Sequence, residues 1–163
     1  MERKSRRPNR NRRPGGGRHK ADIAKIDRIL IDIQKSLRDS IEPLSLENLT
    51  AYERKRIHSF FDDKPEFKTK TYRNGEDFVL KVFPIGNLKK FADEKVKYVL
   101  ETGLSVHLEN LGNYERFIIH DHLKSAEGIE TTSSGEEDNR VLEIKQKQFG
   151  RALKKIIKKI KLF

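Results

Sequence analysis

The sequence predicts an α/β protein built from two small helix-strand-helix-strand-strand units in tandem, with an amphipathic helix after them. Two observations support this prediction. Nine of the thirteen residues from Leu46 to His58 are identical to their counterparts from Leu108 to His120, at an offset of 62 positions. Helical and strand-like spacings of apolar residues also alternate in the same order on both sides of that offset. A period this long indicates a duplicated small domain rather than a solenoid repeat.

The first unit is assigned to residues 21–85. Thr50 and Glu53 have the spacing of a capping box, which predicts that a helix opens at this point. Asn74-Gly75 is typical of the tight turn of a β-hairpin. The expected elements are a helix over 23–41, a strand over 44–49, a helix over 50–62, and strands over 67–72 and 78–83.

The second unit is assigned to residues 86–147 and repeats this order. Gly103 is expected to end its first helix, and Gly112 takes the place of the capping Thr50, which weakens the cap only slightly. Residues 148–163 then form a basic amphipathic helix, because their apolar residues recur at helical spacing with lysines between them. The elements expected in the second unit are a helix over 88–102, a strand over 105–108, a helix over 113–125, and strands over 129–132 and 140–145.

The positive charge of the chain lies in its two ends. Of the total of +11, residues 1–20 contribute +8 and residues 145–163 contribute +8, so residues 21–144 carry −5. Residues 1–20 are rich in Arg, Gly, Pro and Asn without apolar periodicity, and we expect them to be a disordered tail. Basic arms favour a polyanion because binding releases its counterions. The alternative is a tail that only improves solubility.

Composition bounds the location and the packing of the protein. The chain has no cysteine, which excludes disulfides and thiolate chemistry and fits a reducing compartment. It has neither a signal-peptide pattern nor an apolar run long enough to span a membrane, so we expect a cytoplasmic protein. A unit of roughly 60 residues buries a small fraction of its surface. We therefore expect the two units to pack on each other or on the C-terminal segment.

The second helix of the second unit carries a distinctive polar window. Arg116 and His120 are four residues apart, so they stand on one face of the helix, and Lys124 extends that face by a further turn. Apolar residues, Phe117 included, fill most of the remaining circumference. This pattern predicts a largely buried helix from which the three polar side chains reach solvent or a ligand. The alternative is that Arg and His bond strand carbonyls and only hold the unit together.

These residues resemble a known family. The stretches from Tyr114 to His120 and from Thr132 to Glu137, followed by Arg140, look like the R3H domain, which is named for its Arg-x-x-x-His. The likeness is greatest to the C-terminal domain of the Jag-type bacterial RNA-binding proteins, whose entry segment resembles Glu101 to Leu111. The resemblance implies helices against a three-stranded sheet, and binding of single-stranded nucleic acid with little sequence preference.

Carried over by position, Arg116 and His120 are the signature pair and Arg140 lies on the neighbouring strand. Lys124 joins them as the next residue of the polar window. Jag-type proteins usually place a KH domain before this one, but the present sequence has no Gly-x-x-Gly loop that could clamp a nucleic-acid backbone. The resemblance thus covers residues 44–84 and 104–146, together with the helix before each.

The first unit matches the family pattern less completely. Arg54 and His58 correspond to the signature pair, but Phe78 stands where the second unit has Arg140. The neighbouring Lys55 and Arg56, with an exposed Phe78, would compensate by charge and stacking. The complete set of expected nucleic-acid-binding residues is Arg116, His120, Lys124, Arg140, Arg54, His58 and Arg56.

The function expected from the sequence is non-enzymatic binding of single-stranded RNA or DNA, without a cofactor or a small-molecule substrate. No nucleophile elbow or phosphate-binding loop is present. A metal site at His120-Asp121-His122 is not expected, since alternate helical residues diverge by about 200°. The alternative is a protein-interaction or membrane-surface scaffold with structural Arg/His pairs. The C-terminal helix would then pack on the body, dock on a partner, or lie on an anionic membrane.

Overall fold

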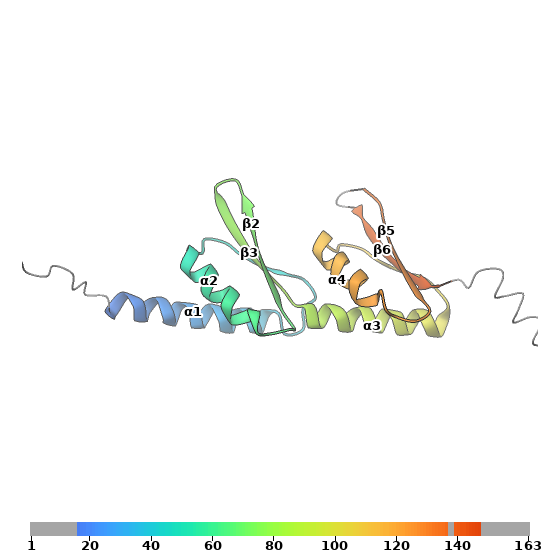
Figure 1. Ribbon diagram of the computed structural model, residues 1–163, viewed down its shortest axis with the longest axis horizontal. Helices are drawn as coiled ribbons and strands as arrows, with labels where there is room; N and C mark the ends of the chain where they lie inside the picture. Colours follow the sequence, from blue (N-terminus) through green and yellow to red (C-terminus); the bar gives the residue numbers. More distant parts are fainter. Residues whose placement is uncertain (1–15, 137–138, 148–163) are drawn as a thin grey trace, which may run out of the picture.

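A computed structural model describes residues 16–136 and 139–147, which form four helices and two three-stranded antiparallel sheets (Figure 1). The predicted mixed α/β class is therefore confirmed. The predicted helix over 148–163 lies outside the described residues. In chain order the elements are α1 (Gly16–Ser36), β1 (Leu44–Leu46), α2 (Ala51–Asp62), β2 (Lys68–Asn74), β3 (Asp77–Phe83), α3 (Ile85–Thr102), β4 (Val106–Leu108), α4 (Asn113–Leu123), β5 (Ile129–Ser134) and β6 (Val141–Gln146).

The helix boundaries differ from the prediction mainly at α1. This helix begins at Gly16, inside the segment expected to be disordered, and ends at Ser36 rather than Ile41. The early end of α1 is explained by a side chain that lies far along the sequence. The side-chain amide of Asn87 donates hydrogen bonds to the carbonyls of Leu37, Arg38 and Ser40, at 2.9 to 3.0 Å. Carbonyls at a helix end need such partners, and no local sequence pattern reveals this one.

Local signals placed the start of α2 and the end of α3 correctly, whereas α3 begins at Ile85 rather than at 88 and α4 ends at Leu123 rather than at 125. Thr50 and Glu53 form the predicted capping box, with the Thr50 side chain accepting from the Glu53 amide and the Glu53 carboxylate accepting from the Thr50 amide. Gly103 ends α3 in the left-handed conformation, with φ of 73°. Glycine adopts this conformation without the steric cost that other residues have.

Each sheet places its last strand in the centre. The order is β1-β3-β2 in the first sheet and β4-β6-β5 in the second. The registers correspond at the offset of 62, since Leu44 pairs with Val82 and Val106 pairs with Ile144. The order of elements and the register of the strands are thus the same in both halves of the described chain.

Each half has its own apolar core. In the first half, Ile33, Ile57 and Leu80 are fully buried where α1 and α2 cover one face of the sheet. In the second half, Ile119 and Leu142 occupy the places of Ile57 and Leu80 and are equally buried. Apolar burial of this kind is the main driving force for folding.

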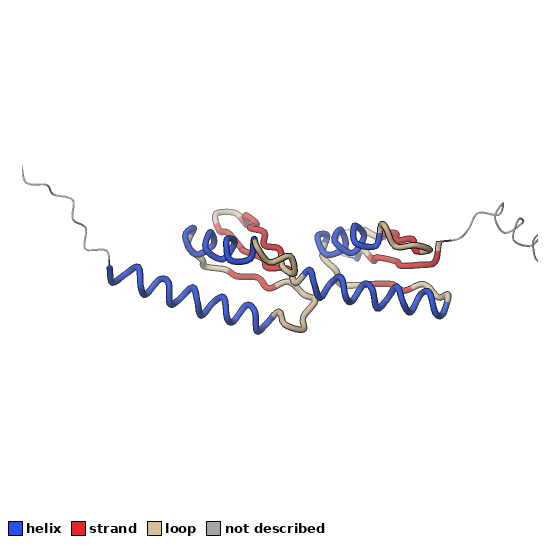
Figure 2. The backbone as a smooth tube through the Cα atoms, turned by 60° about the horizontal axis from the view of Figure 1, so that its bottom comes forward, coloured by secondary structure: helices blue, strands red, loops and turns tan. Residues whose placement is uncertain are grey.

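The two halves contact each other, as expected for units of this size. α1 and α3 lie end to end along one side of the molecule, and both hairpins project from that side in the same direction (Figure 1). In Figures 1 and 2 the first sheet lies between α2 and α4. Phe83 of β3 packs edge-on against Tyr114 of α4, with ring centroids 4.7 Å apart. Within the described residues, no helix has the length and apolar character needed to cross a bilayer.

Candidate functional site

Arg116 does not project outward as the sequence predicted. The residue is only 7% exposed, and its guanidinium donates to the carbonyl of Leu111, to the side-chain oxygen of Asn113 and, at 3.4 Å, to the carbonyl of Arg140. These bonds connect the loop before α4, the first turn of α4, and the residue that precedes β6. The expected exposure is wrong, and the first role of Arg116 is to hold the unit together.

A conformation in the preceding loop explains why the arginine turns inward. Asn110 has a positive φ of 58°, and Asn48 in the first half has a φ of 56°. Asparagine tolerates this left-handed region better than most residues. In each half the following leucine carbonyl accepts a hydrogen bond from the arginine, with Arg54 donating to Leu49 at 2.5 Å.

His120 faces solvent, as the sequence predicted. Its Nδ1 shares a hydrogen bond of 2.5 Å with the Thr131 hydroxyl on β5, and its Nε2 has no partner among the described residues. Beside it, the Ser133 hydroxyl oxygen is buried and has no hydrogen-bond partner in the described part of the chain. A buried hydroxyl without a partner is rare and costs free energy, so this one needs a physical explanation.

These groups line a hollow between α4 and the second sheet. Its volume is about 440 Å³. Among the described residues, the lining contains two arginines, one histidine and one large aromatic ring, and no carboxylate. The residues are Asn113, Arg116, Phe117, His120, Ser133, Arg140 and Leu142.

Phe117 is 60% exposed at the rim of this hollow. The sequence had placed it among the buried residues of the helix, and that expectation is wrong. Its ring lies nearly parallel to Tyr114, at an interplanar angle of 14° and a centroid distance of 6.2 Å. Arg140 is also exposed, and its guanidinium reaches the carbonyl of Ser133 at 3.5 Å. The hollow therefore has a flat aromatic face on one side and a cation on the other.

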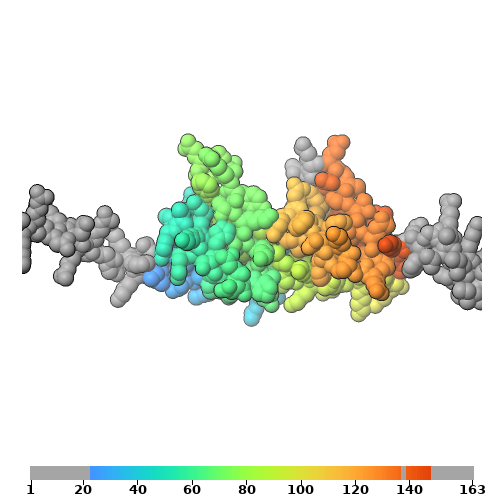
Figure 3. Space-filling view, viewed as in Figure 1, coloured from blue at the N-terminus to red at the C-terminus, as the bar shows by residue number. Residues whose placement is uncertain are grey.

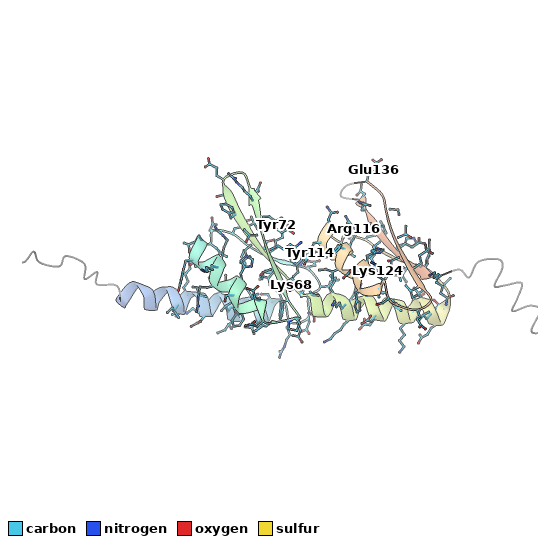
Figure 4. The ribbon with its side chains drawn as sticks, viewed as in Figure 1. Lys68, Tyr72, Tyr114, Arg116, Lys124 and Glu136 are labelled. Carbon is cyan, nitrogen blue, oxygen red and sulfur yellow. The ribbon has the colours of Figure 1, made fainter. Side chains whose placement is uncertain are left out.

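The other predicted site residues of the second half lie elsewhere. Lys124 is exposed, but it follows the last residue of α4 and does not line the hollow. Figure 4 shows it at the opposite end of the helix from Arg116. The same view places Glu136 at the tip of the hairpin, away from Arg116.

The first half presents a different surface around its arginine. Arg54 is half-buried, and its guanidinium lies over the Phe78 ring, 4.7 Å from the centroid. The adjoining hollow of about 230 Å³ is lined by Glu47, Glu76 and Asp77 as well as Arg54 and Phe78. Carboxylates here would repel a phosphate. The predicted stacking role of Phe78 is weakened, because one face of its ring already carries the guanidinium.

His58 also differs from its counterpart. Its Nδ1 contacts the Thr69 hydroxyl at 2.5 Å and its Nε2 contacts the Thr71 hydroxyl at 2.9 Å, so both ring nitrogens have partners. In the second half, Ser133 stands at the position of Thr71 and makes no such bond. Arg56 is exposed on α2. Both nitrogens of the His58 ring thus have hydrogen-bond partners, whereas Nε2 of His120 has none among the described residues.

The two histidines of His120-Asp121-His122 are directed to different partners. His122 lies 2.8 Å from the carboxylate of Asp93 on α3, whereas His120 bonds Thr131 on β5. Within residues 16–136 and 139–147, no three metal-binding side chains converge on a common point.

Comparison with known families decides the class of the second half. Residues 86–146 match the R3H domain. The match runs from the start of α3 to the end of β6, and R3H domains generally bind single-stranded nucleic acid. The predicted resemblance to the R3H domain is confirmed for residues 86–146. A comparison of the chain with curated proteins gives no match.

Sequence reasoning missed four members of the hollow, Asn113, Phe117, Ser133 and Leu142, and two of them, Phe117 and Ser133, carry the proposed contacts. Phe117 follows the signature arginine directly, and a large apolar residue between the Arg and the His was available as a signal. Ser133 could have been found from the alternation of β5, because it lies two residues after Thr131 and therefore on the same face.

Proposed function

We propose that this chain is a non-enzymatic, cytoplasmic RNA-binding protein that takes up unpaired strands with little sequence preference. The hollow of the R3H domain is the main site. We further infer that residues 21–85 are a diverged copy of the same unit, related like the second to the Jag-type domain. The shared strand register, the arginine bond to a leucine carbonyl and the histidine bond to a threonine support this inference.

The observation that carries the proposal is the pair of unused polar atoms in the hollow. His120 Nε2 and Ser133 Oγ lie beside the Arg140 cation and the Phe117 ring, with no carboxylate among the described residues that line the hollow. A phosphate or ribose oxygen would satisfy the two unused atoms, Arg140 would neutralise the charge, and a base would stack on Phe117. Unpaired bases are needed for this last contact, which favours single strands over duplex.

The basic ends supply a second, non-specific component. Each of residues 1–20 and 145–163 carries +8, and each phosphate contact with a single strand contributes about 0.7 to the slope of log affinity against log salt. Removing residues 1–15 and 148–163, which lie outside the helices and strands of the two halves, should flatten that slope while leaving the preference for unpaired strands. The preference should depend on the hollow alone.

A titration with a fluorescent single-stranded RNA, in competition with unlabelled single-stranded and duplex RNA, tests the proposal. The double variant His120→Ala/Arg140→Ala should bind at least tenfold more weakly and lose the preference for single strands. Lys89→Ala, which removes one exposed positive charge from α3, should change the affinity less than twofold. Equal losses in the double variant and in Lys89→Ala would mean that the hollow is not the site.

One observation favours a second candidate function, a scaffold in which the arginines are purely structural. Both Arg54 and Arg116 are bound to loop carbonyls, as that reading requires. A scaffold would bind nucleic acid through its basic ends only. Its binding would then disappear at moderate salt and would not distinguish single strands from duplex, so the same competition experiment separates the two functions.

A further inference from the structure

The outer face of the first sheet, which is the face turned away from α2, is directed toward the second half of the molecule. Along β2, Thr69 and Thr71 turn toward His58, so the alternation of a strand directs Lys68, Lys70 and Tyr72 to the outer face. Both Lys70 and Tyr72 are exposed. Figure 3 shows a notch between the two hairpins on this side of the molecule.

Side chains of α4 meet this face directly. The ammonium of Lys70 lies 3.4 Å from the centroid of the Tyr114 ring, and Figure 4 shows Tyr72 close beside Tyr114. On β3, Lys81 is paired with Lys70 and its ammonium lies 5.5 Å from the centroid of the Tyr72 ring. We call the set Lys70, Tyr72, Lys81, Tyr114 and Phe117 the junction surface.

The junction surface is continuous with the hollow. Phe117 lines the hollow and lies parallel to Tyr114, which in turn contacts Lys70. Burial raises the pKa of the Tyr114 hydroxyl, and burial together with the nearby Tyr114 and Glu115 raises that of Tyr72. Both phenols therefore remain neutral well past physiological pH, and their rings present no charge that would repel a phosphate.

The charge pattern of the two sheets indicates what this surface binds. The facing strands carry no acid between Lys68 and Arg73 or between Phe78 and Phe83. On the corresponding outer face of the second sheet stand Glu130 and Glu143, the latter paired with Lys145 at 3.3 Å. Among the described residues, the outer face of the first sheet combines the exposed Tyr72 ring with Lys70 and Lys81, neither of which forms an ion pair with a carboxylate. This combination suits the bases and phosphates of a single strand.

We propose that the two halves form one composite site, in which a single strand leaves the hollow over Phe117 and Tyr114 and continues along the outer face of the first sheet. This inference rests on the proposed function of the hollow. The first half then contributes through Lys70, Tyr72 and Lys81 rather than through its own Arg54 and His58. The doubling of the unit lengthens the strand that is bound.

Affinity measured against strand length tests this arrangement. Single-stranded RNAs of about 4 and about 12 nucleotides span the range of small single-strand binding sites. Lys70→Ala/Tyr72→Ala should weaken binding of the longer RNA about tenfold and leave the shorter unchanged, whereas Tyr72→Phe should behave as wild type. Ultraviolet crosslinking of the longer RNA should label the peptide containing Tyr72.

The matched control is Lys97→Ala/Tyr98→Ala, which removes the same two residue types from the exposed side of α3 and should change neither affinity. If Lys70→Ala/Tyr72→Ala binds the longer RNA like wild type, or loses both lengths equally, the composite site is wrong. In that case His120→Ala/Arg140→Ala would still bind weakly and the proposed function would stand. If wild type binds neither RNA in preference to duplex, the proposed function itself fails.

Discussion

The two halves of this chain share a framework and differ in what surrounds it. In both, an arginine at the start of the second helix bonds a leucine carbonyl, and a histidine one turn later bonds a threonine hydroxyl. The second half adds an exposed Arg140 and Phe117 and leaves Ser133 without a hydrogen-bond partner among the described residues. The first half has Phe78 against its arginine and acids around it.

This difference shows that the Arg-x-x-x-His spacing fixes the shared framework but not the exposed groups beside it. The arginine is used first to connect a loop, a helix and a strand, and the accessible chemistry comes from neighbours that the spacing does not include. In the second half, His120 Nε2 and Ser133 Oγ have no hydrogen-bond partner among the described residues. In the first half, both ring nitrogens of His58 bond threonine hydroxyls. The predictions below exchange or remove these neighbours, in order of decreasing expected effect.

The largest contrast should be in stability at the two arginines. Arg116→Ala leaves the carbonyls of Leu111 and Arg140 without their buried cationic donor, and we expect a loss of about 3 kcal/mol in the free energy of unfolding. Arg54 makes one such bond from a half-buried position, so Arg54→Ala should lose about 1 kcal/mol. Urea denaturation of both variants measures the difference. Equal losses in the free energy of unfolding would contradict the prediction that Arg116 stabilises the fold more than Arg54 does.

An exchange at the equivalent positions Phe78 and Arg140 should alter RNA affinity. Arg140→Phe removes the exposed cation of the hollow and should weaken binding of single-stranded RNA about tenfold, equivalent to about 1.4 kcal/mol. Phe78→Arg should restore little binding to the first half, because Glu47, Glu76 and Asp77 remain beside it. Isothermal titration of each variant gives both affinities. A large gain from Phe78→Arg would show that one residue separates the two halves.

Ser133 and Thr71 should respond to alanine with opposite signs. Ser133→Ala removes a buried hydroxyl that has no partner, so the free protein should keep its stability or gain up to about 1 kcal/mol, while RNA affinity falls. Thr71→Ala breaks the bond to His58 and should lose about 1 kcal/mol without changing RNA affinity. Thermal melts with and without RNA separate these effects. A destabilised Ser133→Ala would mean that the hydroxyl is already satisfied.

The smallest expected effect concerns acid stability of the first half. The Lys25 ammonium, 2.6 Å from the Glu53 carboxylate, and the Thr50 amide lower the pKa of Glu53 below its ordinary 4.5. A lowered pKa stabilises the fold above pH 4.5, and this contribution is lost as the pH falls through the lowered value. Glu53→Gln should therefore cost about 1 kcal/mol at pH 7 and flatten the pH dependence of unfolding below 4.5. If Glu53→Gln leaves the pH dependence of unfolding below 4.5 unchanged, this prediction is wrong.

Most of the fold could be predicted from sequence because its signals are local. The capping pair Thr50 and Glu53, the Asn74-Gly75 turn and the Gly103 stop each fix a boundary through contacts with residues a few positions away. The early end of α1 could not be predicted, since it depends on Asn87 from the next unit. Local patterns do not record such long-range hydrogen bonds.

The site was predicted less well than the fold, for a related reason. A helical wheel shows which residues share a face but not where the neighbouring sheet lies. Arg116 turns inward because Asn110 orients a loop that offers the Leu111 carbonyl, and Phe117 stays outside because the sheet covers the other side of α4. The exposed His120 followed from the spacing, and Arg140 lies one residue before β6 rather than on it as the resemblance implied.

The central claim is that the second half, and not the helix face of the first, binds single-stranded RNA through its Arg/His surroundings. Two charge-matched double variants test it most directly, His120→Ala/Arg140→Ala and Arg56→Ala/His58→Ala, in one fluorescence anisotropy titration at fixed salt. We predict at least a tenfold loss of affinity for the first variant and less than a twofold loss for the second. Equal losses, or the larger loss in Arg56→Ala/His58→Ala, would contradict the account.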